Sequence, residues 1–266
     1  MKIVVLIKQV PDMEKVKFDS EKGTIDRKSA GTEINPFDLN ALEAAIQIKE
    51  KTDATVTVIS MGPPSAEDAL REAIARGADE GILITDKYFG GADTKATSHT
   101  LAAAIKKMGD FHLILAGEKT VDGDTGQVGA ETADYLNIPH VSYVSNIEEV
   151  TLEGLQVVSE ISSGSYLKEM KLPGLITVTK DINTPRLPAF KRKMMARKAE
   201  IKKLTLADLQ DFLTVEEAGL KGSPTWVNKI EVPSMPTREG KIFRDDILAA
   251  TDTLIELFKE TKVMEG

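Results

Sequence analysis

The stretch FHLILAGEKTVDGDTGQVGAETADYL, residues 111–136, joins a short apolar segment to a polar loop and then to a helical pattern. The apolar residues at 111–117 are bounded by turn-forming residues, which is typical of a strand buried on both faces. In an open parallel sheet, ligands bind where a strand ends and its loop leads into the N-terminus of a helix. This stretch therefore predicts an α/β fold with a ligand site at the loop.

The rest of the N-terminal half repeats the same alternation. Three further apolar, β-branched segments are predicted strands, at residues 2–7, 54–60 and 81–85. Helical patterns alternate with them, at residues 35–51, 65–80 and 93–109. Asn35 and Ser65 are the expected N-caps of the first two helices, and Gly77 is the expected end of the second. Alternation from residue 1 to about 138 predicts a parallel sheet with helices on both faces.

The pattern changes after Pro139. We expect antiparallel pairing at a sheet edge from three strand patterns that have no helices between them, at residues 155–161, 165–172 and 174–180. Residues 186–203 are rich in lysine and arginine, and the sequence that follows through Gly240 shows little helical or strand periodicity. We therefore expect an extended arm there. A helix with one apolar face is predicted over 244–262, with Ile247, Thr251, Leu254, Ile255 and Phe258 on that face. The expected division is a nucleotide-binding domain at 1–185, an arm at 186–240 and a C-terminal docking helix at 241–266.

The composition excludes several kinds of site and partner. The 266 residues contain no cysteine, which rules out disulfides, thiolate catalysis and iron–sulfur clusters. The three histidines lie far apart in the sequence, so we expect no metal site. No segment approaches the ~20 apolar residues that cross a bilayer, and the N-terminus is typical of a strand, so we expect a cytoplasmic protein without a membrane span. The net charge of −8 argues against nucleic acid as a partner.

The loop of residues 118–127 has the chemistry of a nucleotide site. Glycines at 123, 126 and 129 allow close approach of the backbone to a ligand, and the following helix N-terminus favours phosphate. Asp122 and Asp124 suit ribose hydroxyls or an adenine edge, but beside a pyrophosphate they would repel it unless they turn away. A nucleotide site of unspecified kind and a polar turn without any ligand both remain open at this point.

Better-known phosphate and cation motifs do not match this loop. An EF-hand needs an acid or amide where Gly126 stands and a glutamate where Ala133 stands. A Walker A loop needs Gly-Lys-Ser/Thr, and the glycine spacing differs from G-x-G-x-x-G. Three other loops should reach the same rim of the sheet, at residues 7–12, 60–68 and 85–98. Four converging loops favour a whole mononucleotide or dinucleotide, with helix capping or phosphate and ribityl contacts as the alternative roles of Asp93, Thr94 and Thr97.

Several segments resemble one known family, the β subunit of electron-transfer flavoproteins. They are INPFDLNALEAA (34–45), GADEGIL (77–83), LAGEKTVDGDTGQVGAETADYLNIP (115–139), KLPGLITVTKDINTPR (171–186) and the basic run after Pro185. The resemblance covers nearly the whole chain. It implies a heterodimer with an α subunit, in which the β subunit supplies an adenine nucleotide α hydrolase-like domain and α chiefly binds an FAD that shuttles electrons.

Members of this family differ in what the β subunit binds. In the respiratory type the site holds AMP and the loop reads approximately Asp-Asp-Asp-x-x-Gln-Thr-Gly-Gln. The present loop, DGDTGQVG at 122–129, is similar to the electron-bifurcating type, in which a second FAD takes the place of AMP. There NADH is the electron donor, one electron goes to ferredoxin, and the other passes through the α-subunit FAD to a flavin dehydrogenase. A simple electron carrier with structural AMP is the alternative within the family.

The resemblance also implies which residues bind. Cofactor contacts are expected at Ile7, Asn35, Pro36, Phe37, Asp38, Met61, Val121, Asp122, Gly123, Asp124, Thr125, Gly126, Gln127, Val128, Gly129 and Ala130. Because a flavin carries the redox chemistry, no catalytic acid or base is expected. Glycine at position 123, where the respiratory type has an acid, removes bulk and a charge and is compatible with a larger anionic ligand.

The basic run matches the partner-recognition loop of the family. Partner contacts are expected at Phe190, Lys191, Arg192, Lys193 and Met194, with Phe190 at the position of an apolar anchor that is usually leucine. An aromatic anchor within a cationic rim suits an interface with an acidic partner. The different anchor leaves open an acyl-CoA dehydrogenase or a flavin dehydrogenase for a 2-hydroxyacid such as lactate. Without the resemblance, a solvated charged strand would be the simplest interpretation. A nucleotide sensor of the universal-stress type shares the architecture but does not account for this arm.

Overall fold

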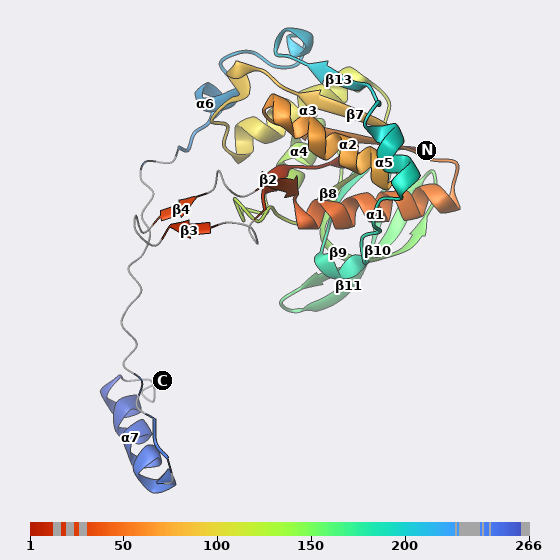
Figure 1. Cartoon of the computed structure of the whole chain (residues 1–266). Coiled ribbons are helices and arrows are strands. Elements are labelled where there is room, and N and C mark those ends of the chain that lie inside the picture. The colour runs from red at the N-terminus through yellow and green to blue at the C-terminus, as the bar shows by residue number, and fades with distance from the viewer. Residues whose placement is uncertain are drawn as a thin grey trace. The chain divides into compact units, whose positions relative to one another are not determined.

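The computed structural model describes residues 1–12, 17–19, 24–26, 31–226, 228, 240, 242–244 and 246–261. The chain divides into two compact units, Met1–Asn228 and Lys229–Gly266. The first unit is built on a nine-stranded sheet with helices on both faces (Figure 1). The α/β class and the parallel sheet predicted from the sequence are confirmed.

The strands of the large sheet lie in the order β11 (Gly164–Lys171), β10 (Gly154–Ile161), β9 (His140–Val150), β12 (Gly174–Val178), β8 (Leu113–Gly117), β1 (Lys2–Leu6), β6 (Thr55–Met61), β7 (Glu80–Ile84) and β13 (Ile201–Leu204). Every neighbouring pair from β9 to β13 is parallel. The hairpin of β10 and β11 pairs antiparallel with β9 and forms one end of the sheet.

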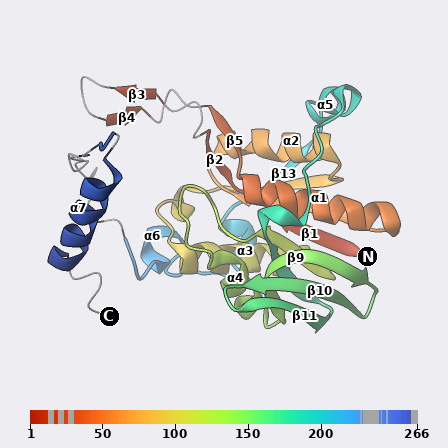
Figure 2. The same ribbon diagram turned by 90° about the horizontal axis from the view of Figure 1, so that it is seen from below.

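Two helices cover each face of the sheet (Figure 2). α1 (Pro36–Lys51) and α2 (Glu67–Arg76) pack on one face, and α3 (Thr94–Met108) and α4 (Val128–Leu136) on the other. Along β1, Ile3 and Val5 contact the first layer while Val4 and Leu6 contact the second. Both faces of the central strands are therefore buried, which explains their uninterrupted apolar sequences.

The direction of the chain reverses at β1. From β1 the chain adds β6 and β7 on one side, and after α3 it returns to place β8 on the other side of β1. The gap between the carboxyl ends of β1 and β8 is thus a topological switch point, where open α/β sheets bind ligands. Beyond β1 the chain forms small antiparallel ribbons, β2 (Gln9–Pro11) with β5 (Thr32–Ile34), and β3 (Lys17–Asp19) with β4 (Thr24–Asp26).

The helix ends differ in part from the expected caps. Gly77 ends α2 with φ +143°, as predicted. Ser65 is not the cap of α2, because a 3-10 turn (η1, Pro64–Ala66) precedes the helix and the Ser65 hydroxyl bonds to Gln9 instead. Asn35 stands at the N-cap position of α1 but makes no capping bond, since its side chain holds the loop after β8.

The region after Pro139 holds two further differences. β12 is not an antiparallel edge strand: all its residues are buried and it lies parallel between β9 and β8. Residues 201–204, expected within an extended arm, form the strand β13 and pair with β7. The chain there also forms α5 (Phe190–Ala196), η4 (Ala207–Leu209) and α6 (Gly219–Gly222), while η2 (Lys87–Phe89) and η3 (Lys180–Ile182) are short 3-10 turns elsewhere. The segment from 186 to 226 therefore belongs to the first unit, and residues 229–239 of the expected arm lie outside the described residues.

The second unit contains α7 (Ile247–Glu260), which confirms a helix within the predicted 244–262. Asp246 caps it by accepting a hydrogen bond of 3.0 Å from the Ala249 amide. Its apolar side chains are exposed, Ile247 at 82% and Leu254 at 48%, so docking on another subunit stays a prediction. In the described part of the chain, none of the helices combines the length and apolarity that crossing a membrane requires.

Candidate nucleotide-binding cleft

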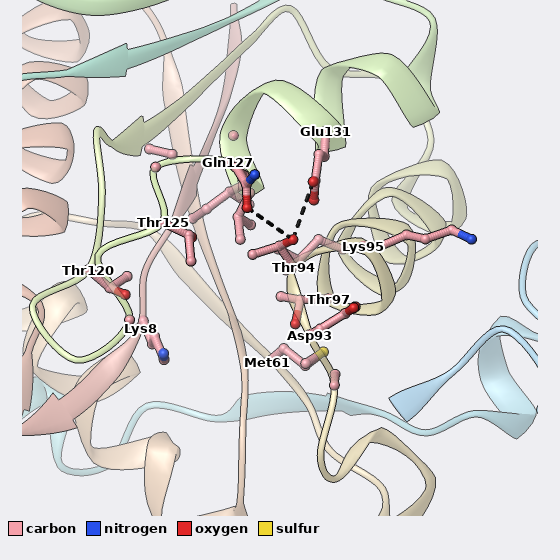
Figure 3. A pocket seen from close by; sticks show the side chains of 18 of the residues that line it. Lys8, Met61, Asp93, Thr94, Lys95, Thr97, Thr120, Thr125, Gln127 and Glu131 are labelled. Carbon is pink, nitrogen blue, oxygen red and sulfur yellow. Dashed lines mark hydrogen bonds between the residues drawn. The ribbon is translucent and has the colours of Figure 1, made fainter. Parts of the chain in front are cut away.

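A cleft of about 1070 Å³ opens at the switch point (Figure 3). The carboxyl ends of β1 and β8 contribute Ile7, Lys8, Gly117 and Glu118 to it, and the loop after β8 contributes its polar wall. The first turns of α3 and α4 complete the wall. The cleft therefore lies where the sequence predicted a ligand site.

The structure brings together most of the expected cofactor residues. Those that line the cleft are Ile7, Asp38, Met61, Asp93, Thr94, Thr97, Gly123, Thr125, Gly126, Gln127, Val128, Gly129 and Ala130. Those outside its lining are Asn35, Pro36, Phe37, Val121, Asp122 and Asp124. Lining residues that the sequence did not single out include Lys8, Lys95, Thr120, Glu131, Tyr135 and Thr225. Lys8 could have been found from its place after the first strand, whereas no sequence signal links Thr225 to this rim.

Glycines let the loop approach its neighbours closely. Gly126 has φ +65°, a conformation that side chains rarely adopt. A Cβ on Gly129 would run into Thr177 of β12, so only glycine lets α4 begin this close to the sheet. Asp124 also has a positive φ of 56°, which aspartate tolerates better than most residues. These positions bring the start of α4 to the wall of the cleft.

Asn35 fixes the loop from behind. It is fully buried, its Nδ2 donates to the Lys119 carbonyl at 2.9 Å, and its Oδ1 accepts from the Val121 amide at 3.2 Å. A buried amide with partners at both ends holds one arrangement of the backbone. Asn35 is therefore a positioning residue of the site, although it does not line the cleft.

Asp38 ties together the two strands that flank the cleft. Its Oδ2 accepts from the Lys8 amide at 2.8 Å and its Oδ1 accepts from the Gly117 amide at 3.1 Å. Burial raises the pKa of Asp38 to about 7, against the opposing effect of its hydrogen bonds with Asn35, Lys8 and Gly117. One carboxyl group thus joins the end of β1 to the end of β8 at the floor of the cleft.

The start of α3 is held by Asp93. Its Oδ1 accepts from the Ala96 amide at 3.1 Å, and its Oδ2 accepts from the Thr225 amide and hydroxyl at 3.1 and 2.8 Å. Burial acts to raise the pKa of Asp93, but these hydrogen bonds together lower it below its ordinary value. Asp93 is therefore an ionised helix cap that also fastens the 223–225 segment to the rim.

α3 and α4 are joined beside the cleft by side chains. The Thr94 hydroxyl lies 3.4 Å from Gln127 Oε1 and 3.3 Å from Glu131 Oε1 (Figure 3). The buried Ser98 hydroxyl donates to the other Glu131 oxygen at 3.0 Å. Two helix N-termini, each with a positive dipole end, thus stand side by side, which favours phosphate groups, although Asp93 already caps the Ala96 amide of α3.

The arrangement favours binding over acid–base catalysis. The carboxylate oxygens of Asp38 and Asp93 accept hydrogen bonds from backbone amides and a hydroxyl group. Those of Glu131 accept hydrogen bonds from the hydroxyl groups of Thr94 and Ser98. Among the residues that the structure describes, no group of three or more histidine, aspartate or glutamate side chains could hold a metal ion. What the cleft offers is a wall formed by two helix N-termini and a glycine-bearing loop, which leads onto the ends of two strands.

The expected partner-binding residues lie on α5. Phe190 begins this helix and is 80% exposed, and Met194 and Met195 are exposed beside it. Lys191, Arg192 and Lys193 are also exposed. Phe190, Met194 and Met195 thus form an exposed apolar group beside cations, and its contact with a partner stays a prediction.

Comparison with known proteins shows which family the chain belongs to. The family model for the electron transfer flavoprotein domain matches residues 22–209. A curated electron transfer flavoprotein subunit beta of Thermoanaerobacterium thermosaccharolyticum is 45% identical over 267 residues, which cover 99% of this chain and 100% of that protein. The chain belongs to the electron transfer flavoprotein β-subunit family.

Other relatives in this family carry more specific names. Subunit CarD of a caffeyl-CoA reductase–Etf complex from Acetobacterium woodii is 40% identical over 268 residues, covering 99% of this chain and 100% of that protein. Protein FixA of Azorhizobium caulinodans is 38% identical over 274 residues, covering 100% of this chain and 96% of that protein. Electron transfer flavoproteins are flavin-linked, and their β subunits pair with an α subunit.

Proposed function

We propose that this chain is the β subunit of an electron-bifurcating electron transfer flavoprotein that acts in the cytoplasm. It binds FAD in the cleft, with NADH as electron donor. One electron goes to ferredoxin and the other, through the FAD of the α subunit, to a flavin dehydrogenase. The dehydrogenase acts on an acyl-CoA or on a 2-hydroxyacid such as lactate.

The observation that carries the proposal is the size and lining of the cleft. A volume of about 1070 Å³ is slightly above the roughly 300–1,000 Å³ typical of ligand pockets, which suits a dinucleotide. Gly123 lines this space without a side chain. A Cβ there would meet only Thr120 Oγ1, at 3.4 Å, so the loop leaves room for a large ligand.

The residues present fit an FAD. The first turns of α3 and α4 would hold its pyrophosphate, and Asn35 and Asp38 would keep the loop and the strand ends in place around it. When bound, the flavin supplies the transfer of one or two electrons. The protein's part is to bind, to orient and to exclude water.

The remaining contacts of the heterodimer follow from the exposed surfaces. α5 presents Phe190 and its basic neighbours to the dehydrogenase, and the apolar face of α7 docks on the α subunit. The name of the Acetobacterium relative, a subunit of a caffeyl-CoA reductase–Etf complex, supports a partner of this kind.

The test is a coupled assay on the purified αβ complex. We expect NADH oxidation to require both ferredoxin and the dehydrogenase with its acceptor, and ferredoxin to become reduced as NADH is consumed. NADH oxidation that proceeds fully with the dehydrogenase alone, or none with both acceptors present, would contradict bifurcation.

A further inference from the structure

Two ion pairs neutralise the two aspartates of the loop 118–127. Lys8 Nζ lies 2.8 Å from Asp122 Oδ1 and 2.7 Å from Asp122 Oδ2, and Lys119 Nζ lies 2.8 Å from Asp124 Oδ1. Both lysines line the cleft, whereas neither aspartate does. Each carboxylate is thus drawn to a lysine at the rim and away from the space that a ligand would occupy.

The two pairs differ in their exposure to water. The Asp122 side chain is 30% exposed and bonds to Lys8 through both oxygens, while the Asp124 side chain is 67% exposed. Burial acts to raise the pKa of Asp122, but hydrogen bonds from Lys8 and Thr120 and the charge of Lys8 together lower it below its ordinary value. Asp122 is therefore a fixed negative charge close to the cleft, and water screens it less than Asp124.

An unpaired carboxylate at this place would repel a phosphate-bearing ligand. We propose that Lys8 is a positioning residue of the cleft, which allows a phosphate-bearing ligand to bind by neutralising Asp122 and holding it out of the ligand space. Lys119 does the same for Asp124, with a smaller effect. The inference rests on the proposed nucleotide function and deepens it, because it explains how a loop with two aspartates accepts an anionic nucleotide.

The neutralising role differs from direct binding of phosphate by Lys8. If the ammonium group of Lys8 contacted the ligand itself, removing it would weaken ligand binding by the same factor whether or not Asp122 is charged. If it acts through Asp122, removing both charges should restore most of the binding. A double-mutant cycle separates the two roles.

The experiment uses the αβ complex after removal of the nucleotide from the cleft, with ADP as the probe, since ADP is the part of FAD that carries the pyrophosphate. Titration calorimetry gives the dissociation constant for the wild type, Lys8→Met, Asp122→Asn and the double variant. Lys107→Met is the matched control, because Lys107 pairs with Asp211 at 3.7 Å outside the cleft lining.

We expect Lys8→Met to weaken ADP binding about tenfold, which is roughly the effect of one uncompensated nearby charge. Asp122→Asn alone should bind more tightly than wild type, since Lys8 then faces the ligand with a free charge. The double variant should return to within about threefold of wild type, and salt should lessen the Lys8→Met defect because it screens the freed Asp122. Lys119→Met should show a smaller defect than Lys8→Met.

A double variant as weak as Lys8→Met would overturn the proposal, because Lys8 would then contact the ligand directly. Wild-type affinity in Lys8→Met would also overturn it. Circular dichroism and melting temperature serve to check folding, and we expect the variants to be folded because the Lys8 side chain is 45% exposed. If the wild-type complex itself bound neither ADP nor FAD in the cleft, the proposed function would fail instead, so the two failures are distinguishable.

Discussion

The cleft rim and α5 are both expected to contact another molecule, yet they are made of opposite kinds of residues. The rim is built mainly from glycines, threonines and backbone groups around a hollow, with Lys8, Lys95 and Lys119 among them. α5 carries Phe190, two methionines and three cations on an exposed surface. Small residues make space for a ligand that enters the protein, and large exposed ones suit a partner that covers the surface.

The two regions are alike in being held from beneath. Asn35 and Asp38 hold the rim. At the far end of α5, Arg71 donates to the carbonyls of Ala196 and Arg197 at 3.1 and 3.2 Å and to that of Ala199. Before α5, Arg186 donates to the buried Glu43 at 2.8 Å and to Glu50. Each region is therefore preorganised, and the predictions below test what holds each one.

The largest effect is expected in the rim from Gly117→Ala. The added Cβ would lie 2.5 Å from Asp38 Oδ1 and 2.7 Å from the backbone of Phe37, so β8 and α1 must move apart. The added methyl group overpacks the site and weakens the hydrogen bond between the residue 117 amide and Asp38. Together we expect these effects to lower the free energy of unfolding by roughly 2–4 kcal/mol. Denaturant unfolding measures it. Gly123→Ala is the control within the same rim. An equal loss of the free energy of unfolding in that variant would show that close packing at Gly117 is not the cause.

The second prediction separates the regions by pH. The pKa of Asp38 is about 7 in the folded state and near 3.8 when unfolded, so the folded state retains a proton between these values. The free energy of unfolding should therefore fall as pH rises from about 4 to 7 and level off above. Asp38→Asn should abolish this slope. Parallel pH curves for the variant and the wild type would contradict the assignment.

The anchor of α5 should respond in the opposite direction. Burial acts to raise the pKa of Glu43, but the bonds from Arg186 lower it below 4.5. The contribution of Glu43 to the free energy of unfolding is complete above the pKa that Glu43 has in the unfolded chain. It is lost as pH falls through the lower pKa that Glu43 has in the folded state. The anchor of α5 therefore weakens below about pH 4.5, outside most of the Asp38 window.

The third prediction concerns the exposed surface itself. Phe190→Ala should weaken coupling to the dehydrogenase by roughly 1–3 kcal/mol, because an exposed aromatic anchor is removed, and should leave flavin content unchanged. The measurement is the KM of the dehydrogenase for the αβ complex. Leu152→Ala is the matched control, since Leu152 is 67% exposed but lies in the turn before β10. Equal KM values for the wild type, Phe190→Ala and Leu152→Ala would show that Phe190 is not part of the interface.

The smallest effect is expected from Arg71→Met, which frees the end of α5 but keeps its surface. Loss of preorganisation costs about 1 kcal/mol, so the KM for the dehydrogenase should rise several-fold while kcat changes little. If Arg71→Met weakened binding as much as Phe190→Ala, the arginine would itself belong to the interface.

The sequence predicted the parallel part of the fold because each early strand is apolar on both faces and each helix has its own pattern. It misassigned 174–180 because a buried five-residue strand carries no sign of which neighbour it pairs with, and β12 returns to lie beside β8. β13 was missed since Ile201 and Leu204 enclose two lysines, as in a surface loop. The same applies to the site. The acids of the 118–127 loop were evident, but Lys8 pairs with Asp122 across 114 residues, and only the fold brings them together.

The most direct test of the central claim is the nucleotide content of the purified αβ complex. The complex is denatured, and the released ligands are separated by chromatography and quantified per heterodimer. Two FAD and no AMP per heterodimer would agree with a cleft that holds a working flavin. One FAD and one AMP would contradict the claim, and the cleft would then hold a structural nucleotide in a one-flavin electron carrier.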